Sequence, residues 1–324
     1  RCRYHAGLNM AVLTIQSGDN MPDTDYGLLN ERFGIRGQLS FSAGPGDLPV
    51  VAVGNSLATA TIALQGAHVM TWTPRGQQPV LWLSRAAKFA PGKSIRGGVP
   101  ICWPWFGPHA TEPKFPAHGF ARTVMWKVIE TQALRDGRTR LVFELIENDV
   151  TRAFWPHSTQ VQYIVTVGNS LELELVTRNT GKTAVVIGGA LHTYFGVDDV
   201  RNCAVHGLGN SPYLDMVDGG KKKTQVGPVV IDREVDRIYL ESIPDILIDD
   251  PDLNRRIRVS KRGSRSSVVW NPWIDKAEKM GDLGEHGYLK MLCVESTNAD
   301  ADVVSIAPGG EHRLSVRYSV EALA

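Results

Sequence analysis

The 324-residue sequence lacks the features that mark several large classes of protein. It has only 4 cysteines and no Cys-x-x-Cys pair, which argues against a disulfide framework or zinc ribbon and favours reduced thiols. Its 35 basic and 34 acidic residues leave a formal net charge of +1, so no nucleic-acid partner is expected. No apolar run approaches the roughly 20 residues of a membrane span. We therefore expect a cytoplasmic protein that binds neither nucleic acid nor membrane.

Common catalytic and nucleotide-binding motifs are missing too. There is no Gly-x-Gly-x-x-Gly after a predicted strand and no P-loop, so nucleotide binding is not supported. The serine-hydrolase motif Gly-x-Ser-x-Gly is absent, as are the close metal-ligand spacings His-x-His and His-Glu-x-x-His. These absences argue against a nucleotide-binding protein, a serine hydrolase and a metal enzyme with closely spaced ligands.

Long amphipathic helices are absent as well, and short alternating strands fill the chain instead. From about Gly37, strand candidates recur at a spacing of roughly 8–14 residues. Residues 171–177 read LELELVT, a strict period of two that is typical of a half-buried strand. Only Thr151–Phe154 and Ile274–Met280 suggest short helical turns. We predict an all-β fold, one large and mainly antiparallel β-sandwich over residues 31–324, with residues 1–30 as an N-terminal arm or residues appended to the domain.

Residues 92–122 interrupt the strand pattern. They read GKSIRGGVPICWPWFGPHATEPKFPAHGFAR, and so much Gly and Pro fits neither a helix nor a plain strand. We expect a shaped loop system that carries polar groups on an aromatic floor, the setting in which binding sites commonly lie. Its candidate polar groups are Arg96, His118 and Arg122.

Arg96 stands next to Gly97 and Gly98, where the backbone can approach a ligand closely. A guanidinium group also suits bidentate phosphate binding, and Lys93 and Arg75 could join it. The alternative is that Arg96 pairs with a buried carboxylate and holds the loop in place.

Two histidines and a glutamate end apolar or Gly-rich segments. His118 lies in PAHGFAR, His192 follows GGAL, and Glu295 follows LCV. A carboxylate at the end of an apolar strand is costly unless it is paired, so Glu295 calls for a function or a partner. Imidazole and carboxylate together can act as general acid and general base. Taken singly, His192 fits a hydrogen-bonded core histidine better than a catalyst.

A metal site is the rival interpretation of the same three residues, because two His and one Glu could form an open triad. The three are 74 and 103 residues apart in turn, with no close ligand spacing, so we expect no metal. A weaker candidate is Asp236, which follows Asp232 at i+4 and leads into a strand. It could hydrogen-bond sugar hydroxyl groups.

The motifs IRGGVPICWPWFGP, PAHGFAR, LHTYF, DREVDRIY and CVES occur in this order along the chain. In these motifs the sequence resembles the aldose 1-epimerase-like D-hexose-6-phosphate mutarotases, also called glucose-6-phosphate 1-epimerases. The resemblance runs from about Gly37 to Tyr318.

This resemblance implies a galactose-mutarotase-like β-supersandwich with no metal or organic cofactor. It implies interconversion of the anomers of a hexose 6-phosphate, most simply glucose 6-phosphate, by an acid and a base on opposite sides of the hemiacetal. The roles that it implies are general acid for His192, general base for Glu295, auxiliary imidazole for His118, sugar hydroxyl ligand for Asp236, and substrate binding at the phosphate end for Arg96.

The same resemblance leaves other assignments open. Arg122 belongs to the HGFAR motif but receives no clear role from it, and Arg75 and Lys93 lie where the pattern is loose. The expected partner is a small-molecule sugar phosphate, and we expect a monomer. The alternative function is a non-catalytic phosphosugar-binding or sensor protein on the same fold.

Overall fold

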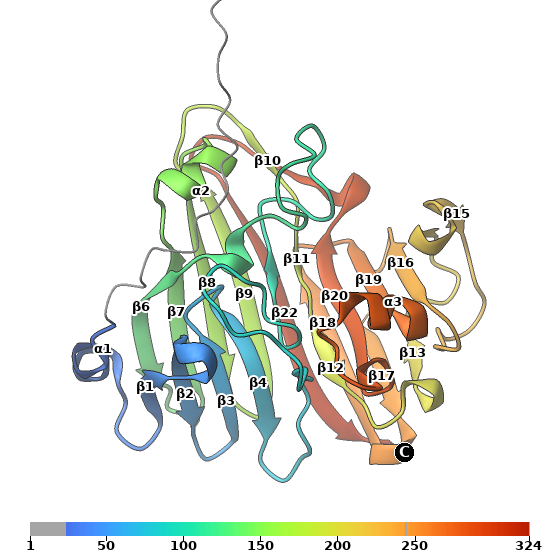
Figure 1. Ribbon diagram of the computed structural model, residues 1–324, viewed down its shortest axis with the longest axis horizontal. Helices are drawn as coiled ribbons and strands as arrows, with labels where there is room; N and C mark the ends of the chain where they lie inside the picture. The colour runs from blue at the N-terminus through green and yellow to red at the C-terminus, as the bar shows by residue number, and fades with distance from the viewer. Residues whose placement is uncertain (1–23, 244, 324) are drawn as a thin grey trace, which may run out of the picture.

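The computed structural model describes residues 24–243 and 245–323, and most of its regular structure is antiparallel β-sheet (Figure 1). Helices are few and short in these residues: α1 (Tyr26–Phe33), α2 (Asp149–Phe154) and α3 (Trp273–Met280). The predicted all-β antiparallel sandwich is therefore confirmed. The two expected helical turns correspond to α2 and α3.

One eight-stranded sheet forms a continuous layer, in the order β13, β17, β18, β22, β9, β8, β7, β6. Alternating side chains of these strands point into the molecule, as the period of two in β9 predicts. The strands are β6 (Trp126–Ala133), β7 (Thr139–Leu145), β8 (Thr159–Val167), β9 (Ser170–Asn179), β13 (Ala204–His206), β17 (Ile246–Asp250), β18 (Arg255–Arg262) and β22 (Glu311–Ala322).

A four-stranded sheet and a second eight-stranded sheet form the facing layer. The four-stranded sheet contains β1 (Leu39–Ala43), β2 (Pro49–Gly54), β3 (Ala58–Ala63) and β4 (His68–Pro74). The second eight-stranded sheet contains β5 (Ile101–Cys102), β11 (Gly189–Leu191), β12 (Tyr194–Gly196), β14 (Tyr213–Asp215), β15 (Lys221–Lys223), β16 (Val235–Tyr239), β19 (Ser266–Asn271) and β20 (Met291–Asn298). A separate pair consists of β10 (Val185–Ile187) and β21 (Val304–Ile306).

Strand β20 is buried along its whole length because both of its faces are covered. Leu292 and Val294 belong to the main core between the two layers. Met291 and Cys293 point the other way, into a smaller cluster that also contains Ala277 of α3. The outer face of this sheet is therefore roofed by α3 and neighbouring loops, and it is the face that also carries Glu295.

The expected domain boundary at residue 30 falls inside α1. Tyr26, Leu29 and Phe33 of this helix pack against the main core, so residues 26–30 belong to the folded unit. Residues 1–23 of the expected arm lie outside the described residues. Among the described helices, none combines the length and the apolar character that crossing a membrane requires.

Candidate active site

His192 and Glu295 meet across two neighbouring strands. Leu191 pairs with Ser296 and Tyr194 pairs with Cys293, and the same register places His192 opposite Glu295. The Nε2 atom of His192 lies 3.4 Å from Oε1 of Glu295. The acid and base expected on opposite sides of a hemiacetal thus lie side by side. We call these two residues the His192–Glu295 pair.

The pair is nearly closed off from water. The exposed fraction is 9% for His192 and 1% for Glu295, and neither His192 Nδ1 nor Glu295 Oε2 has a hydrogen-bond partner among the described residues. Burial lowers the pKa of His192 well below its usual value, and the nearby His118 and arginines lower it further. Burial raises the pKa of Glu295 well above its usual value, and the Asp236 charge adds to this. Both shifts favour the uncharged forms, so the pair holds one proton between its two members when Glu295 is protonated and His192 is neutral.

Aromatic rings fix the orientation of the His192 imidazole. It stacks on Tyr194, with ring centroids 5.0 Å apart and planes inclined by 10°. Trp270 contacts the imidazole edge-on at 6.0 Å, and Trp82 stacks on the far side of Tyr194 at 5.9 Å. His192 and Tyr194 are two residues apart along one extended segment, so their side chains share a face.

His118 lies beside this stack, with its ring centroid 5.9 Å from that of His192. The backbone N–H of Gly107 donates to His118 Nδ1 at 3.2 Å, and the His118 N–H donates to Gly107 O at 2.7 Å. Burial and the charges of Arg122 and Arg96 lower the pKa of His118 to about 3. The ring is therefore neutral near pH 7, and because Nδ1 accepts a hydrogen bond, Nε2 carries the proton. This is the form that can donate to a sugar oxygen.

Arg96 is held from two directions. Its Nε donates to Oδ1 of Asp282 at 3.0 Å, and its Nη1 donates to the Tyr194 hydroxyl at 2.8 Å. Asp282 is fixed in turn, because its carbonyl oxygen accepts a hydrogen bond from Ser84 Oγ at 2.7 Å. Arg96 therefore does pair with a carboxylate, as the alternative interpretation of this residue expected. Its charge also lowers the pKa of His192 and His118, so Arg96 faces the site as well.

Arg122 lies at the edge of the same site, since its charge lowers the pKa of both His118 and His192. Its Nη2 donates to Ala117 O at 3.0 Å. Lys93 is linked to this region indirectly: the Gln65 side chain bonds to the Lys93 carbonyl, and Gly66 packs against the Arg122 backbone.

Arg75 is not brought to the site. It follows Pro74 at the end of β4, and its Nε donates to Ser56 O at 2.6 Å in an exposed turn. His68, at the other end of β4, is the residue that contacts the loop of the site, through Gly97 O at 2.8 Å. Seven strand residues separate these ends by roughly 20 Å.

Asp236 lies on β16, one strand beyond β19 and two beyond β20. Its carboxylate is 3.5 Å from Lys276 of α3, and burial raises its pKa. The Asp236 charge also acts on Glu295 and Cys293, which places it on the outer face of the sheet with them.

Sequence reasoning missed three contributors to this site. Tyr194 lies within the LHTYF motif, where the i, i+2 spacing from His192 was the available signal. Cys293 precedes Glu295 by the same spacing. Asp282 gave no local signal, because its partner Arg96 is 186 residues away.

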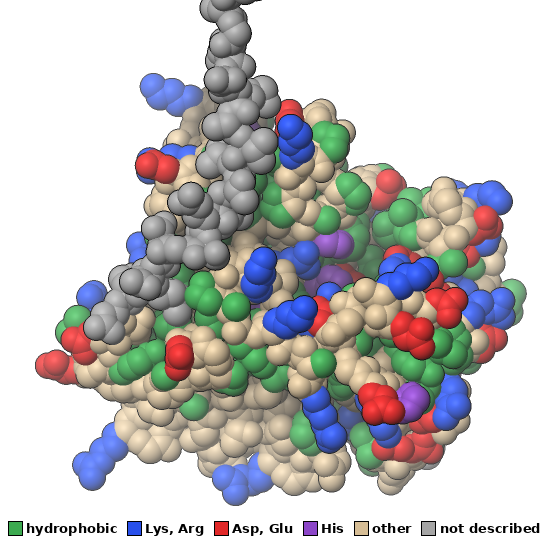
Figure 2. All heavy atoms as spheres, in the orientation of Figure 1, with side chains coloured by type: hydrophobic (Ala, Val, Ile, Leu, Met, Phe, Trp, Pro, Cys, Tyr) green, Lys and Arg blue, Asp and Glu red, His purple; other side chains and the backbone are tan. Residues whose placement is uncertain are grey.

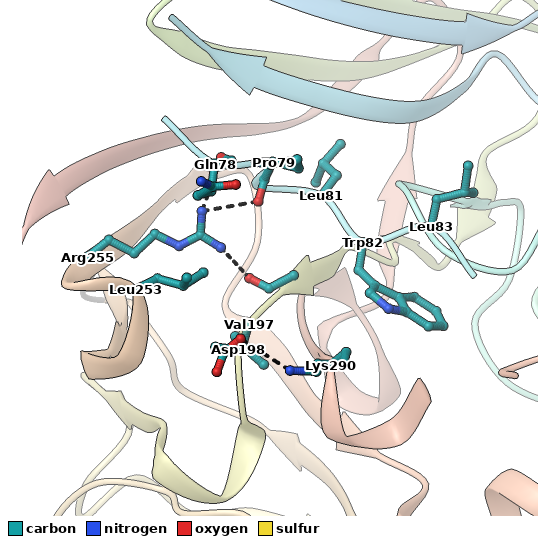
Figure 3. Close-up of a pocket in the computed structure, with 11 residues that line it drawn as sticks. Gln78, Pro79, Leu81, Trp82, Leu83, Val197, Asp198, Leu253, Arg255 and Lys290 are labelled. Carbon is teal, nitrogen blue, oxygen red and sulfur yellow. Dashed lines mark hydrogen bonds and ion pairs between the residues drawn. The ribbon is translucent and has the colours of Figure 1, made fainter. Parts of the chain in front are cut away.

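The surface around the site is hollowed, and Figure 2 shows histidine side chains within a depression near the centre of this face, beside Lys and Arg side chains. A separate cavity of about 350 Å³ shares Trp82 with the site (Figure 3). Its buried Arg255 donates to the carbonyl oxygens of Gln78, Pro79 and Gly196. These bonds use Nη1 and Nη2, and Nε lies 3.6 Å from Asp250 Oδ2, so Arg255 is a structural tie between loops.

Known proteins resemble this chain in both sheet architecture and sequence. The sequence model of the Aldose 1-epimerase family matches residues 49–319. A protein of Escherichia coli K12 described as "Putative glucose-6-phosphate 1-epimerase" is 38% identical over 254 residues, which cover 78% of this chain and 84% of that protein. A protein of Cenchrus ciliaris with the same description is 35% identical, over 83% of this chain and 84% of that protein.

A solved structure described as a "putative mutarotase (YeaD)" from Salmonella typhimurium superimposes with a TM-score of 0.82 and 35% identity, covering 88% of this chain and 94% of that one. The antiparallel sandwich and these likenesses place the chain in the class of mutarotases. The chain belongs to the aldose 1-epimerase family. It is thus an isomerase with mutarotase activity, and the resemblance seen in the sequence is confirmed.

Proposed function

We propose that this enzyme interconverts the α and β anomers of a hexose 6-phosphate, with glucose 6-phosphate as the first substrate to test. The observation that carries the proposal is the buried His192–Glu295 pair, with Nε2 and Oε1 3.4 Å apart. The anomeric oxygen O1 and the ring oxygen O5 of a pyranose share the carbon C1. Two adjacent catalytic groups can therefore reach one oxygen each.

Ring opening needs the pair in its charge-separated form, with Glu295 ionised and His192 protonated. Glu295 accepts the proton of the C1 hydroxyl while His192 donates its proton to O5, and the C1–O5 bond breaks to leave the free aldehyde. Rotation about C1–C2 presents the other carbonyl face. On closure Glu295 returns its proton to O1 and His192 accepts the proton from O5, so the pair regains its starting form. His118, neutral and protonated on Nε2, supplies a hydrogen bond near O5.

Two arginines are the candidates for the charged end of the substrate. Within residues 24–243 and 245–323, Arg122 forms no ion pair with a carboxylate, whereas Arg96 is paired with Asp282. A phosphate would gain more from the uncompensated charge. We therefore assign the main phosphate contact to Arg122, with Lys93 as an auxiliary, and assign Arg96 and Asp236 mainly to sugar hydroxyl groups. The descriptions of the bacterial and plant relatives support a phosphorylated sugar.

A non-catalytic binding protein on this fold would be favoured if a structural cation neutralised Glu295. Among the described residues no Lys or Arg forms an ion pair with Glu295, and its close neighbour is the His192 imidazole. The catalytic interpretation therefore has the better support.

The test is α/β exchange of glucose 6-phosphate, measured by NMR magnetisation transfer at the anomeric proton. Glu295→Gln and His192→Ala should each slow exchange by about 10²–10⁴-fold, the usual contribution of one acid or base. Arg75→Ala is the matched control, since that side chain lies at the far end of β4. Wild-type-like exchange in both site variants would show that the roles are wrong.

The phosphate assignment has its own test. Arg122→Ala should raise KM for glucose 6-phosphate by roughly 10-fold or more, the loss expected for a charged hydrogen bond. The KM for free glucose should change far less. Equal changes for both sugars would mean that Arg122 supports the loop and does not bind phosphate.

A further inference from the structure

Cys293 forms a three-residue cluster with the His192–Glu295 pair. Cys293 and Glu295 are two residues apart on β20, so their side chains share the outer face. One ligand atom from each of His192, Cys293 and Glu295 lies within 4.8 Å of the others. Cys293 is a free thiol with no exposed surface. Nothing in ring opening uses a thiol at this position.

Nitrogen, sulfur and carboxylate oxygen together are the ligand types of zinc and related soft divalent ions. Such sites commonly use three protein ligands and leave the fourth position open. Bond lengths of about 2.0–2.3 Å require the three atoms to move together by roughly 1 Å. His118 is not a member, and its Nδ1 is occupied by the Gly107 N–H.

Among the described residues, no Lys or Arg forms an ion pair with Glu295 of this cluster. Within residues 24–243 and 245–323, Glu295 Oε2 is buried without a hydrogen-bond partner, and Asp236 adds a second carboxylate whose charge acts on both Glu295 and Cys293. Of the two arginines that act on the site, Arg96 is already paired with Asp282. A bound divalent cation would compensate the Glu295 carboxylate, whose one ion-pair partner among the described residues is the His192 imidazole.

We propose that His192, Cys293 and Glu295 bind a thiophilic divalent cation such as Zn²⁺, and that this binding blocks the active site. Coordination displaces two protons to solvent, one from the thiol and one from the His192–Glu295 pair, and leaves thiolate, carboxylate and neutral imidazole around the metal. Since two of the ligands are the acid and base, metal and sugar compete. The inhibitory half of this inference rests on the proposed function, whereas metal binding does not.

The binding experiment uses Co²⁺ as a spectroscopic probe on the full chain. Cys2 is replaced by Ser throughout, which leaves Cys102, Cys203 and Cys293 as the thiols. We expect one thiolate-to-cobalt charge-transfer band that saturates at one equivalent and is displaced by Zn²⁺. Cys293→Ser should abolish the band, and the matched control Cys203→Ser should retain it. No band, or a band that survives Cys293→Ser, would overturn the site.

The activity experiment measures anomer exchange of glucose 6-phosphate with added Zn²⁺. The apparent inhibition constant should rise with substrate concentration, and a chelator should restore the rate. The rate of each variant with Zn²⁺ is divided by its own metal-free rate. On this basis the inhibition constant of Cys293→Ser should be at least 10-fold higher than that of the wild type. A cobalt band without inhibition of an active enzyme would overturn the inhibitory half alone. If the metal-free protein exchanges no sugar while the band persists, the proposed function fails and the metal site stands.

Discussion

Replacing Tyr194 by Phe separates two contacts that one side chain makes. The Tyr194 ring stacks on His192, while its hydroxyl accepts a hydrogen bond from Arg96 Nη1 at 2.8 Å. Tyr194→Phe removes only the oxygen. The imidazole therefore keeps its stacking partner, and Arg96 loses one of its two anchors.

The size of the effect follows from the environment of Arg96. A hydrogen bond to a charged group contributes about 1.5–3 kcal/mol. The Arg96 side chain is 25% exposed and keeps Asp282 at 3.0 Å, so water and the remaining partner compensate in part. We therefore expect the lower limit, about 1.5 kcal/mol, or roughly 10-fold in kcat/KM. The loss should fall on KM, because the His192–Glu295 pair is not disturbed.

The assay is NMR exchange of glucose 6-phosphate anomers over a range of substrate concentrations. Tyr194→Leu is the companion variant: it also removes the stacking, which is worth about 0.5–1.5 kcal/mol, and should lower kcat as well. Thermal unfolding of both variants serves as the folding control. A Tyr194→Phe enzyme with lowered kcat and unchanged KM would refute the division of roles, and unchanged kcat/KM would show that the Arg96 contact is dispensable.

Two further predictions concern stability. Burial lowers the pKa of His68 from 6.5 to about 4, so as pH falls through this window the unfolded chain binds the proton first and stability declines. The wild type should lose about 3 kcal/mol from this residue by pH 4, and the slope of Tm against pH should be shallower in His68→Gln. Gly119 has φ +69° and a Cβ there would lie 1.9 Å from Trp103 O, so Gly119→Ala should cost about 3 kcal/mol or more in urea unfolding. Gly107→Ala, at φ +73° with open space, should cost only about 1 kcal/mol, and equal losses in the two variants would contradict the clash.

The local signals in the sequence were strong where burial and backbone shape are determined by neighbouring residues. Glu295 was recognised because a carboxylate at the end of an apolar strand is energetically costly unless it has a partner. The structure buries it on a strand that is covered on both faces. The Gly- and Pro-rich residues 92–122 were recognised as a loop system, and they do carry Arg96, His118 and Arg122 around the site. The period of two likewise predicted the strands of the sandwich.

Contacts between distant strands could not be predicted in this way. The register that places His192 opposite Glu295 depends on pairing between segments 103 residues apart, and no local pattern encodes it. The ion pair of Arg96 with Asp282 has the same origin. The position of Arg75 is likewise not given by local sequence: it follows β4, and the opposite end of that strand contacts the loop of the site.

The 3.4 Å separation within the His192–Glu295 pair bears on what happens when a turnover is interrupted. If the open-chain aldehyde escapes before the ring closes, the proton is left on Glu295 and the imidazole is neutral. A single transfer from Oε1 to the neighbouring Nε2 then regenerates the starting form without a proton from bulk water. An interrupted turnover therefore does not change the protonation state of the His192–Glu295 pair. The enzyme binds its next sugar in the same protonation state, whichever anomer that sugar is.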